Sequence, residues 1–310
     1  MKCKLKEAKT LLLSLLVMAL WGSLFPMIKI GYDALSVNSS DIPSILMFAG
    51  VRFLLCGAIV SVMALVKRDS IGATRVKTLG SMLLIGVFSI TLHYAFAYIG
   101  ISYIDSSKMA LIKQVGALLY VCLAFLFFNN ESFSIWKIVG GLFGFFGVVV
   151  INIDGAGVSL GIGEIMTLLA SVCFVISSIL TKKTVEGASP FWLTGISQLF
   201  GGALLVIIAL FMGGGNSQTT LFGVFVFLYI CVASTVSYLL WSYILKTSEL
   251  SKMLVIKFAE PMFACIFGAL LLGEDILKWQ YLVAFLLICG GIVLANKKQR
   301  KITDDESKNI

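Results

Sequence analysis

Apolar runs of about twenty residues recur along almost the whole chain, and they constrain the fold more than any other feature. A helix rises about 1.5 Å per residue, so a run of this length crosses a hydrocarbon core about 30 Å thick. The runs are continuously apolar, whereas the strands of a membrane barrel alternate over about ten residues. The sequence therefore predicts an all-α integral membrane protein.

Ten transmembrane helices are predicted, separated by short breaks that carry turn residues. The breaks include Asn129-Asn130-Glu131 and Gly213-Gly214-Gly215-Asn216, and none is long enough to hold a soluble domain. The expected spans cover residues 10–31, 43–66, 79–100, 106–128, 135–153, 160–181, 190–212, 221–244, 251–272 and 279–296.

Positive charge collects on one side of these spans. The chain has 24 Lys and Arg against 16 Asp and Glu, a net charge of +8. In the loops and tails, seventeen basic residues fall on one side and Lys278 alone falls on the other. Basic loops stay in the cytoplasm, so we expect a multi-pass protein of the plasma or inner membrane with both termini cytoplasmic. This distribution accounts for the charge without nucleic acid as a partner.

Residues that would serve catalysis or cofactor chemistry are scarce. The seven cysteines include no CxxC pair, and the single histidine and 16 carboxylates form no metal cluster, nucleophile triad or acid pair. No GxxxxGK[ST] loop is present to bind ATP. We expect no enzyme activity, no metal and no cofactor. The expected partners are a small-molecule substrate and the lipid bilayer, and the chain is expected to be a monomer or a homodimer.

A short motif recurs at an offset of 144 residues, in the fourth and ninth spans. Ser107-Lys108-Met109 with Ile112-Lys113 returns as Ser251-Lys252-Met253 with Ile256-Lys257. After a gap of one residue, Glu131 matches Glu274, Trp136 matches Trp279 and Gly147 matches Gly290. An offset of five spans inverts one copy relative to the other, as in many secondary transporters. The expected units are five-helix repeats over 10–153 and 160–296 and a cytoplasmic tail over 297–310.

Other motifs follow one another in a characteristic order. They are Trp21-Gly22-Ser23 with Lys29, Arg52-Phe53, Ala95-Phe96-Ala97-Tyr98 running to Ser106-Ser107, Tyr238-Leu239-Leu240-Trp241, Glu260-Pro261 and Leu271-Leu272-Gly273-Glu274. In order and spacing they resemble the drug/metabolite transporter superfamily, in particular EamA-type proteins built as two five-helix repeats. The resemblance implies a ten-helix transporter with an inverted repeat around a central cavity, lined by spans other than the fifth and tenth. Members handle very different solutes, so the resemblance leaves the substrate open.

The two lysines of the repeated motif lie well inside their spans. A basic side chain at a helix centre costs roughly 2.5 to 3.5 kcal/mol on insertion scales, so it needs a partner or a water-filled cavity. In one interpretation Lys113 and Lys257 bind a carboxylate or phosphate of the substrate. In the other they are structural, and Glu260 neutralises Lys257 from the same helix face. Lys113 has only Gln114 and the more distant Asp105 nearby in the sequence.

The first repeat departs from the family pattern, because Gly116-Ala117 takes the place of Glu260-Pro261. The two lysines are also unusual for amino-acid and drug exporters. They resemble basic residues of relatives that handle phosphates and nucleotide sugars.

Three further sets of residues are candidates. His93 lies mid-span and, with Glu260, could couple transport to protons, because histidine changes its charge near neutral pH; a satisfied buried histidine is the alternative. Arg52 is expected to play a structural role by pairing with Asp33 or Asp41 in the facing loop. We expect aromatic residues to line the cavity: Trp21, Tyr98, Tyr238 and Trp241. The alternative is that these residues form interfacial belts or pack against lipid.

These features predict a secondary transporter of a small organic metabolite, an exporter or exchanger that works by alternating access. The substrate is expected to carry an anionic carboxylate or phosphate group, as an amino acid or an organic acid does. The alternatives are a channel, a scramblase and a membrane protein that transports nothing. Saturable flux with counter-exchange distinguishes a carrier from a channel or scramblase.

Overall fold

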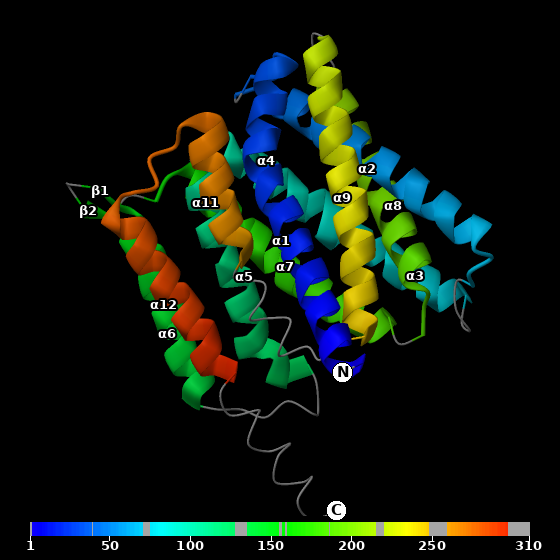
Figure 1. The fold of residues 1–310 in the computed structure, drawn as a ribbon. Coiled ribbons are helices and arrows are strands. Elements are labelled where there is room, and N and C mark those ends of the chain that lie inside the picture. The colour runs from blue at the N-terminus through cyan, green and yellow to red at the C-terminus, as the bar shows by residue number, and fades with distance from the viewer. Residues whose placement is uncertain are drawn as a thin grey trace, which may run out of the picture.

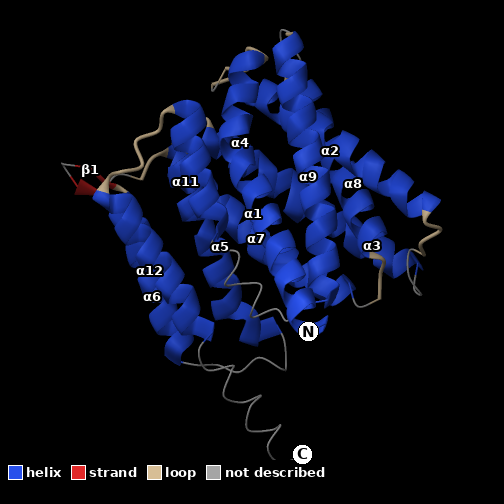
Figure 2. Ribbon diagram, in the orientation of Figure 1, coloured by secondary structure: helices blue, strands red, loops and turns tan. Residues whose placement is uncertain are grey.

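The computed structural model describes residues 2–38, 40–70, 75–127, 135–154, 157–158, 160–185, 187–214, 220–247 and 259–296. These parts of the chain are mostly helical, with short connecting loops and two short strands at one corner (Figure 2). The elements are α1 (Lys2–Ala34), α2 (Ile42–Val66), α3 (Arg75–Ile85), η1 (Gly86–Leu92), α4 (His93–Ile101), α5 (Ser106–Phe127), α6 (Ile135–Ile151), β1 (Ile153–Asp154), β2 (Gly157–Val158), α7 (Ile162–Val185), α8 (Pro190–Phe211), α9 (Leu221–Thr247), α11 (Ala259–Leu272) and α12 (Trp279–Asn296).

The helices form a membrane-spanning bundle. Among the described residues, six helical stretches are long and apolar enough to cross a membrane, and shorter apolar helices cover Ile138–Ile151, Ala259–Leu272 and Trp279–Gly291. Helix α1 begins and helix α12 ends at the same end of the bundle (Figure 1), which we call the near end; the opposite end is the far end. The predicted all-α membrane architecture is confirmed.

Contacts between helices follow the internal repeat. A step of five spans takes α1 to α7, α2 to α8, the α3–η1–α4 span to α9, α5 to α11, and α6 to α12. Helices α2 and α6 each pack against their own counterparts, α8 and α12. Helix α1 packs against α9 and α11, and its counterpart α7 packs correspondingly against α4 and α5. This pattern is that of two copies related by a pseudo-twofold axis, and an odd number of spans in each copy makes the repeat an inverted one.

The third span is interrupted by the π-helical turn η1, although the sequence predicted a uniform helix there. The Thr91 hydroxyl donates to the carbonyl of Gly201 in α8 at 3.1 Å. Glycine is required at the start of the turn, because a Cβ on Gly86 would lie 2.8 Å from the Ser197 carbonyl oxygen. A π-helical turn contains extra backbone per turn, so it changes which side chains of α4 point into the bundle. These side chains include His93, Tyr94 and Tyr98, since α4 begins directly after the π-helical turn.

Helices α6 and α12 lie together at the edge of the bundle (Figure 1). Their backbones approach closely: a Cβ on Gly291 would lie 2.6 Å from the Gly140 carbonyl oxygen, and a Cβ on Gly147 would lie 3.2 Å from that of Ala284. Small residues at such crossings allow the dispersion contacts that hold membrane helices together.

Candidate functional site

A set of buried and half-buried polar side chains lies where the two repeats meet, and we call it the polar centre. The first repeat contributes residues from α2, α4 and α5, and the second contributes residues from α9 and α11. Its members are Arg52, Tyr94, Tyr98, Lys113, Ser234, Tyr238 and Glu260.

Arg52 is the most deeply buried charge of the polar centre, with a relative exposure of 1%. Its Nη1 group donates a hydrogen bond to the Tyr98 hydroxyl, and its Nη2 group donates to the Ser234 hydroxyl across the repeat interface. The guanidinium carbon also lies 4.8 Å from the ring centroid of Phe53 and 5.6 Å from that of Tyr94. Hydroxyls and aromatic faces, which carry no formal charge, therefore surround this cation.

The predicted pairing of Arg52 with Asp33 or Asp41 is wrong. Asp33 is exposed, and the Asp41 carboxylate instead caps α2 by accepting a hydrogen bond from the Ser44 amide at 3.3 Å. From Ile42 to Arg52 the helix rises about 15 Å, so Arg52 lies too deep to reach the loop.

Lys113 and Glu260 are the other charged members of the polar centre. The Lys113 ammonium lies 5.3 Å from the ring centroid of Phe25 and interacts electrostatically with Glu260 of α11. The neighbours that the sequence offered do not fill this role, because Gln114 donates to the Ala110 carbonyl of its own helix and Asp105 is exposed. Glu260 belongs to the other repeat, which adjacency in the sequence does not reveal.

The aromatic residues that the sequence singled out lie together. The ring centroid of Trp21 is 5.9 Å from that of Tyr238 and 5.2 Å from that of Trp241. The Tyr238 hydroxyl shares a hydrogen bond of 2.6 Å with the Tyr94 hydroxyl, and the Tyr94 and Tyr98 ring centroids are 5.9 Å apart. Tyr98 is 1% exposed, so it faces the protein interior and belongs to no interfacial belt.

His93 adjoins the same tyrosine pair. Its Nδ1 atom donates to the Ala170 carbonyl of α7 at 2.7 Å, since a carbonyl can only accept. Its ring stands edge-on to Tyr94 with centroids 4.8 Å apart. Glu260 interacts electrostatically with both Tyr94 and Tyr238. Of the two candidates for proton coupling, His93 contacts this tyrosine pair through Tyr94, and Glu260 lies close enough to affect both tyrosines electrostatically. Lys257 and the predicted tail over 297–310 lie outside the described residues.

Sequence reasoning missed three members of the polar centre. Tyr94 carried a usable signal, because it precedes Tyr238 by 144 residues, the offset of the repeat. Arg52 was noticed but assigned to the wrong partner, although an arginine within an apolar span signals an internal site. We see no sequence signal for Ser234, since serines are frequent in membrane helices.

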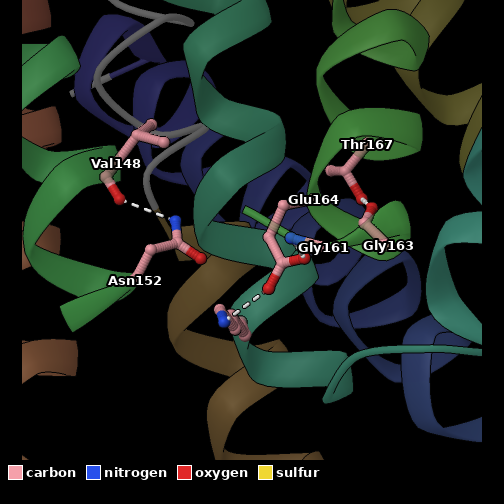
Figure 3. A network of polar contacts seen from close by, with 7 residues as sticks. Val148, Asn152, Gly161, Gly163, Glu164 and Thr167 are labelled. Atoms are coloured by element: carbon pink, nitrogen blue, oxygen red, sulfur yellow. Dashed lines mark hydrogen bonds and ion pairs between the residues drawn. The ribbon is translucent and has the colours of Figure 1, made fainter. Parts of the chain in front are cut away.

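Polar contacts also join the helices at the far end. Both carboxylate oxygens of Glu274 accept amide hydrogen bonds from the start of α5, from Ser106 at 2.7 Å and Ser107 at 2.9 Å. Glu164 of α7 accepts a bond of 2.6 Å from Lys108 of α5 and also one from the Gly161 amide (Figure 3). Helix α5 is therefore tied to the second repeat at this end.

The comparisons with known proteins cover nearly the whole chain. The EamA-like transporter family matches residues 8–153 and 161–296. A relative from Bacillus subtilis (strain 168), named uncharacterized transporter YvbV, is 26% identical over 301 residues, which are 96% of this chain and 94% of the relative. An uncharacterized transporter of Archaeoglobus fulgidus is 24% identical over 284 residues, 91% of this chain and 97% of the relative.

A solved crystal structure shares the fold. It matches with a TM-score of 0.66 at 15% sequence identity, and the match covers 95% of this chain and 99% of the other.

Proposed function

The chain belongs to the EamA-like transporter family, and from this premise we propose that it is a secondary transporter of a small organic metabolite. The polar centre carries the proposal. Ionisable groups within a membrane are costly and are retained where a substrate or ion passes. Here Arg52 and Glu260 lie buried and Lys113 half-buried at the interface of two inverted repeats, where such transporters bind their substrates.

The proposed mechanism is alternating access, with the protein acting as an exporter or exchanger. Inverted repeats offer two related conformations, one open at each end of the bundle. Bonds join the repeats at both ends of the bundle in the present conformation, which supports an occluded state; at the near end Ser189 and Trp192 of the second repeat donate to Asp69 of the first. At the far end, bonds join Glu274 to the start of α5, and the hydroxyl of Thr220, the residue before α9, to the Ala34 carbonyl of α1 at 2.6 Å.

We propose that the near end faces the cytoplasm of a cell whose plasma or inner membrane holds the protein. Basic residues in the loops and tails support this orientation. Both termini would then be cytoplasmic, in a monomer or a homodimer.

The proposed substrate has an organic body and an anionic carboxylate or phosphate group. Trp21, Tyr98, Tyr238 and Trp241 would contact the body through their aromatic faces. Lys113 and Lys257 would contribute positive charge toward the anion in alternating states, one lysine in each of the two conformations. Unchanged affinity and rate in a folded Lys113→Gln variant, beside the exposed Lys278→Gln as control, would show that Lys113 is structural.

Counterflow in liposomes tests the function. The purified full-length chain is reconstituted, loaded with one unlabelled solute at a time from a metabolite panel, and given a trace of the same solute in labelled form outside. We expect transient, saturable accumulation of the label for at least one solute. Unsaturable flux would indicate a channel, and no flux of any solute above empty liposomes would contradict the transport proposal.

A further inference from the structure

We infer that Arg52 holds the carboxylate of the transported substrate, and that the substrates are small organic monocarboxylates. This inference rests on the proposed function and narrows its substrate class. The hydrogen bonds of Arg52 and the charges around it distinguish this residue from the other members of the polar centre.

The guanidinium of Arg52 has N–H groups that make no hydrogen bond. It carries five N–H groups in a rigid fork and is charged at any pH at which a protein folds. Its two terminal nitrogens make one hydrogen bond each, to Tyr98 and Ser234. The third nitrogen, Nε, is buried and has no hydrogen-bond partner. A buried cation with unused donors is costly, so the site calls for an anion with several acceptor oxygens.

No carboxylate whose side chain the structure describes supplies that anion. Glu260 is the one acidic side chain of the polar centre, and it interacts with Lys113. The other carboxylates with described side chains are engaged elsewhere or exposed at the ends of helices: Asp33, Asp41, Asp69, Asp105, Glu164, Glu274 and Asp275. Two cations and one anion leave the polar centre of the described residues with one excess positive charge.

One excess charge matches a carboxylate better than a phosphate. A carboxylate carries a single negative charge, and its two oxygens fit the planar fork of an arginine. A phosphate monoester carries about −1.5 to −2 at neutral pH and would remain under-compensated. The Tyr98 hydroxyl accepts from Arg52 and keeps its own hydrogen, which it can donate to a carboxylate oxygen.

The surroundings of Arg52 specify an apolar body for the substrate. Phe53, Tyr94 and Tyr98 present their rings to the guanidinium, and Tyr94 leads through Tyr238 to Trp21. With an exposure of 1%, Arg52 is occluded in this conformation. The carboxylate therefore reaches Arg52 when the repeats rearrange, as alternating access requires.

Thermal unfolding of the full-length chain in detergent tests the inference. The probes are butyrate, 4-methylpentanoate and 3-phenylpropionate, each beside its own amide, with phenyl phosphate as the competing anion. A compound that binds only the folded protein raises its melting temperature. We expect at least one carboxylate to raise it, its uncharged amide to leave it unchanged, and Arg52→Gln to weaken binding about 10- to 100-fold.

Matched variants separate binding from folding. Arg68→Gln removes an exposed arginine and should bind as the wild type does. Arg52→Lys keeps the charge but loses the fork, so binding should be only partly restored. If Arg52→Gln does not fold, Tyr98→Phe keeps the ring, removes the hydroxyl that contacts Arg52, and should weaken binding about tenfold.

Three outcomes overturn the inference: no carboxylate stabilises the protein, amides stabilise it equally, or phenyl phosphate alone does. Wild-type binding by a folded Arg52→Gln variant overturns it as well. If carboxylates fail but another solute shows saturable counterflow, the substrate class is wrong and the transport function stands. If no solute shows counterflow, the proposed function itself fails.

Discussion

Tyr94 and Tyr238 share a hydrogen bond of 2.6 Å between their hydroxyls, and they stand 144 residues apart, the offset of the internal repeat. They occupy equivalent positions on counterpart spans, α4 and α9. The same residue of each repeat therefore meets its copy where the pseudo-twofold axis passes through the protein. Equivalent groups on such an axis keep their mutual relationship when the two repeats exchange conformations.

Removing one of these hydroxyls should destabilise the protein at least as much as removing both. Tyr94→Phe or Tyr238→Phe leaves the other hydroxyl buried without its partner, and we expect a loss of about 1–3 kcal/mol in the free energy of unfolding. The double variant has no such orphan, so its loss should be no larger than that of a single variant. Unfolding in detergent measures this cycle, and two losses that simply add would contradict the prediction.

Glu274 should stabilise the start of α5. It accepts amide hydrogen bonds from Ser106 and Ser107, and its carboxylate lies 3.8 Å from the Lys29 ammonium. Because a negative charge at a helix N-terminus is favourable, we expect Glu274→Gln to lower the free energy of unfolding by about 0.5–2 kcal/mol. The exposed neighbour Asp275 is the control, and Asp275→Asn should change stability by less than about 0.5 kcal/mol. Equal effects would argue against a capping role.

Gly22 should tolerate no side chain. A Cβ there would lie 2.9 Å from the Ala264 amide nitrogen and 3.0 Å from the Glu260 carbonyl oxygen, so α1 and α11 would have to separate. We expect Gly22→Ala to destabilise the protein by about 1–3 kcal/mol. Gly80 in α3 has nothing within 4 Å of such a Cβ, so Gly80→Ala should be neutral or stabilising by up to about 1 kcal/mol. Melting temperatures of the two variants should therefore move apart, and a stable Gly22→Ala protein would contradict the close approach.

Proton coupling through His93 and Glu260 is testable once a substrate is known. We expect transport by the wild type to respond to a pH gradient across the liposome membrane, and Glu260→Gln and His93→Gln to lose that response while retaining counterflow. Counterflow exchanges one solute molecule for another and needs no net proton movement. Asp33→Asn removes an exposed carboxylate and should keep the response. Wild-type behaviour of both test variants would eliminate this proposal.

The span positions could be predicted because hydrophobicity over twenty residues is a local property. The predicted 43–66 and 190–212 correspond to α2 (Ile42–Val66) and α8 (Pro190–Phe211). The π-helical turn could not be predicted in the same way. It depends on the contact of Thr91 with Gly201, which lies in another helix.

The site was harder to predict than the fold, since it is made of contacts between helices. The sequence selected Tyr98, Tyr238, Trp21 and Trp241, and the structure brings them together through ring contacts and the hydrogen bond between Tyr94 and Tyr238. It assigned Arg52 to the loop aspartates because they were close in sequence. The partner hydroxyl of Ser234 is 182 residues away and becomes a neighbour only through the packing of α2 against α9.

Helices α2 and α6 pack against their own counterparts, and this has a consequence for the history of the chain. Between separate five-helix subunits the same contacts would be isologous, as in a homodimer of antiparallel members. Such a dimer must carry every residue twice. In a single polypeptide the two repeats can differ in sequence. The second repeat therefore has Glu260 where the first repeat has Gly116 at the equivalent position. In the proposed transporter, a substrate site whose halves are alike in backbone but different in charge would hold the solute in a single orientation.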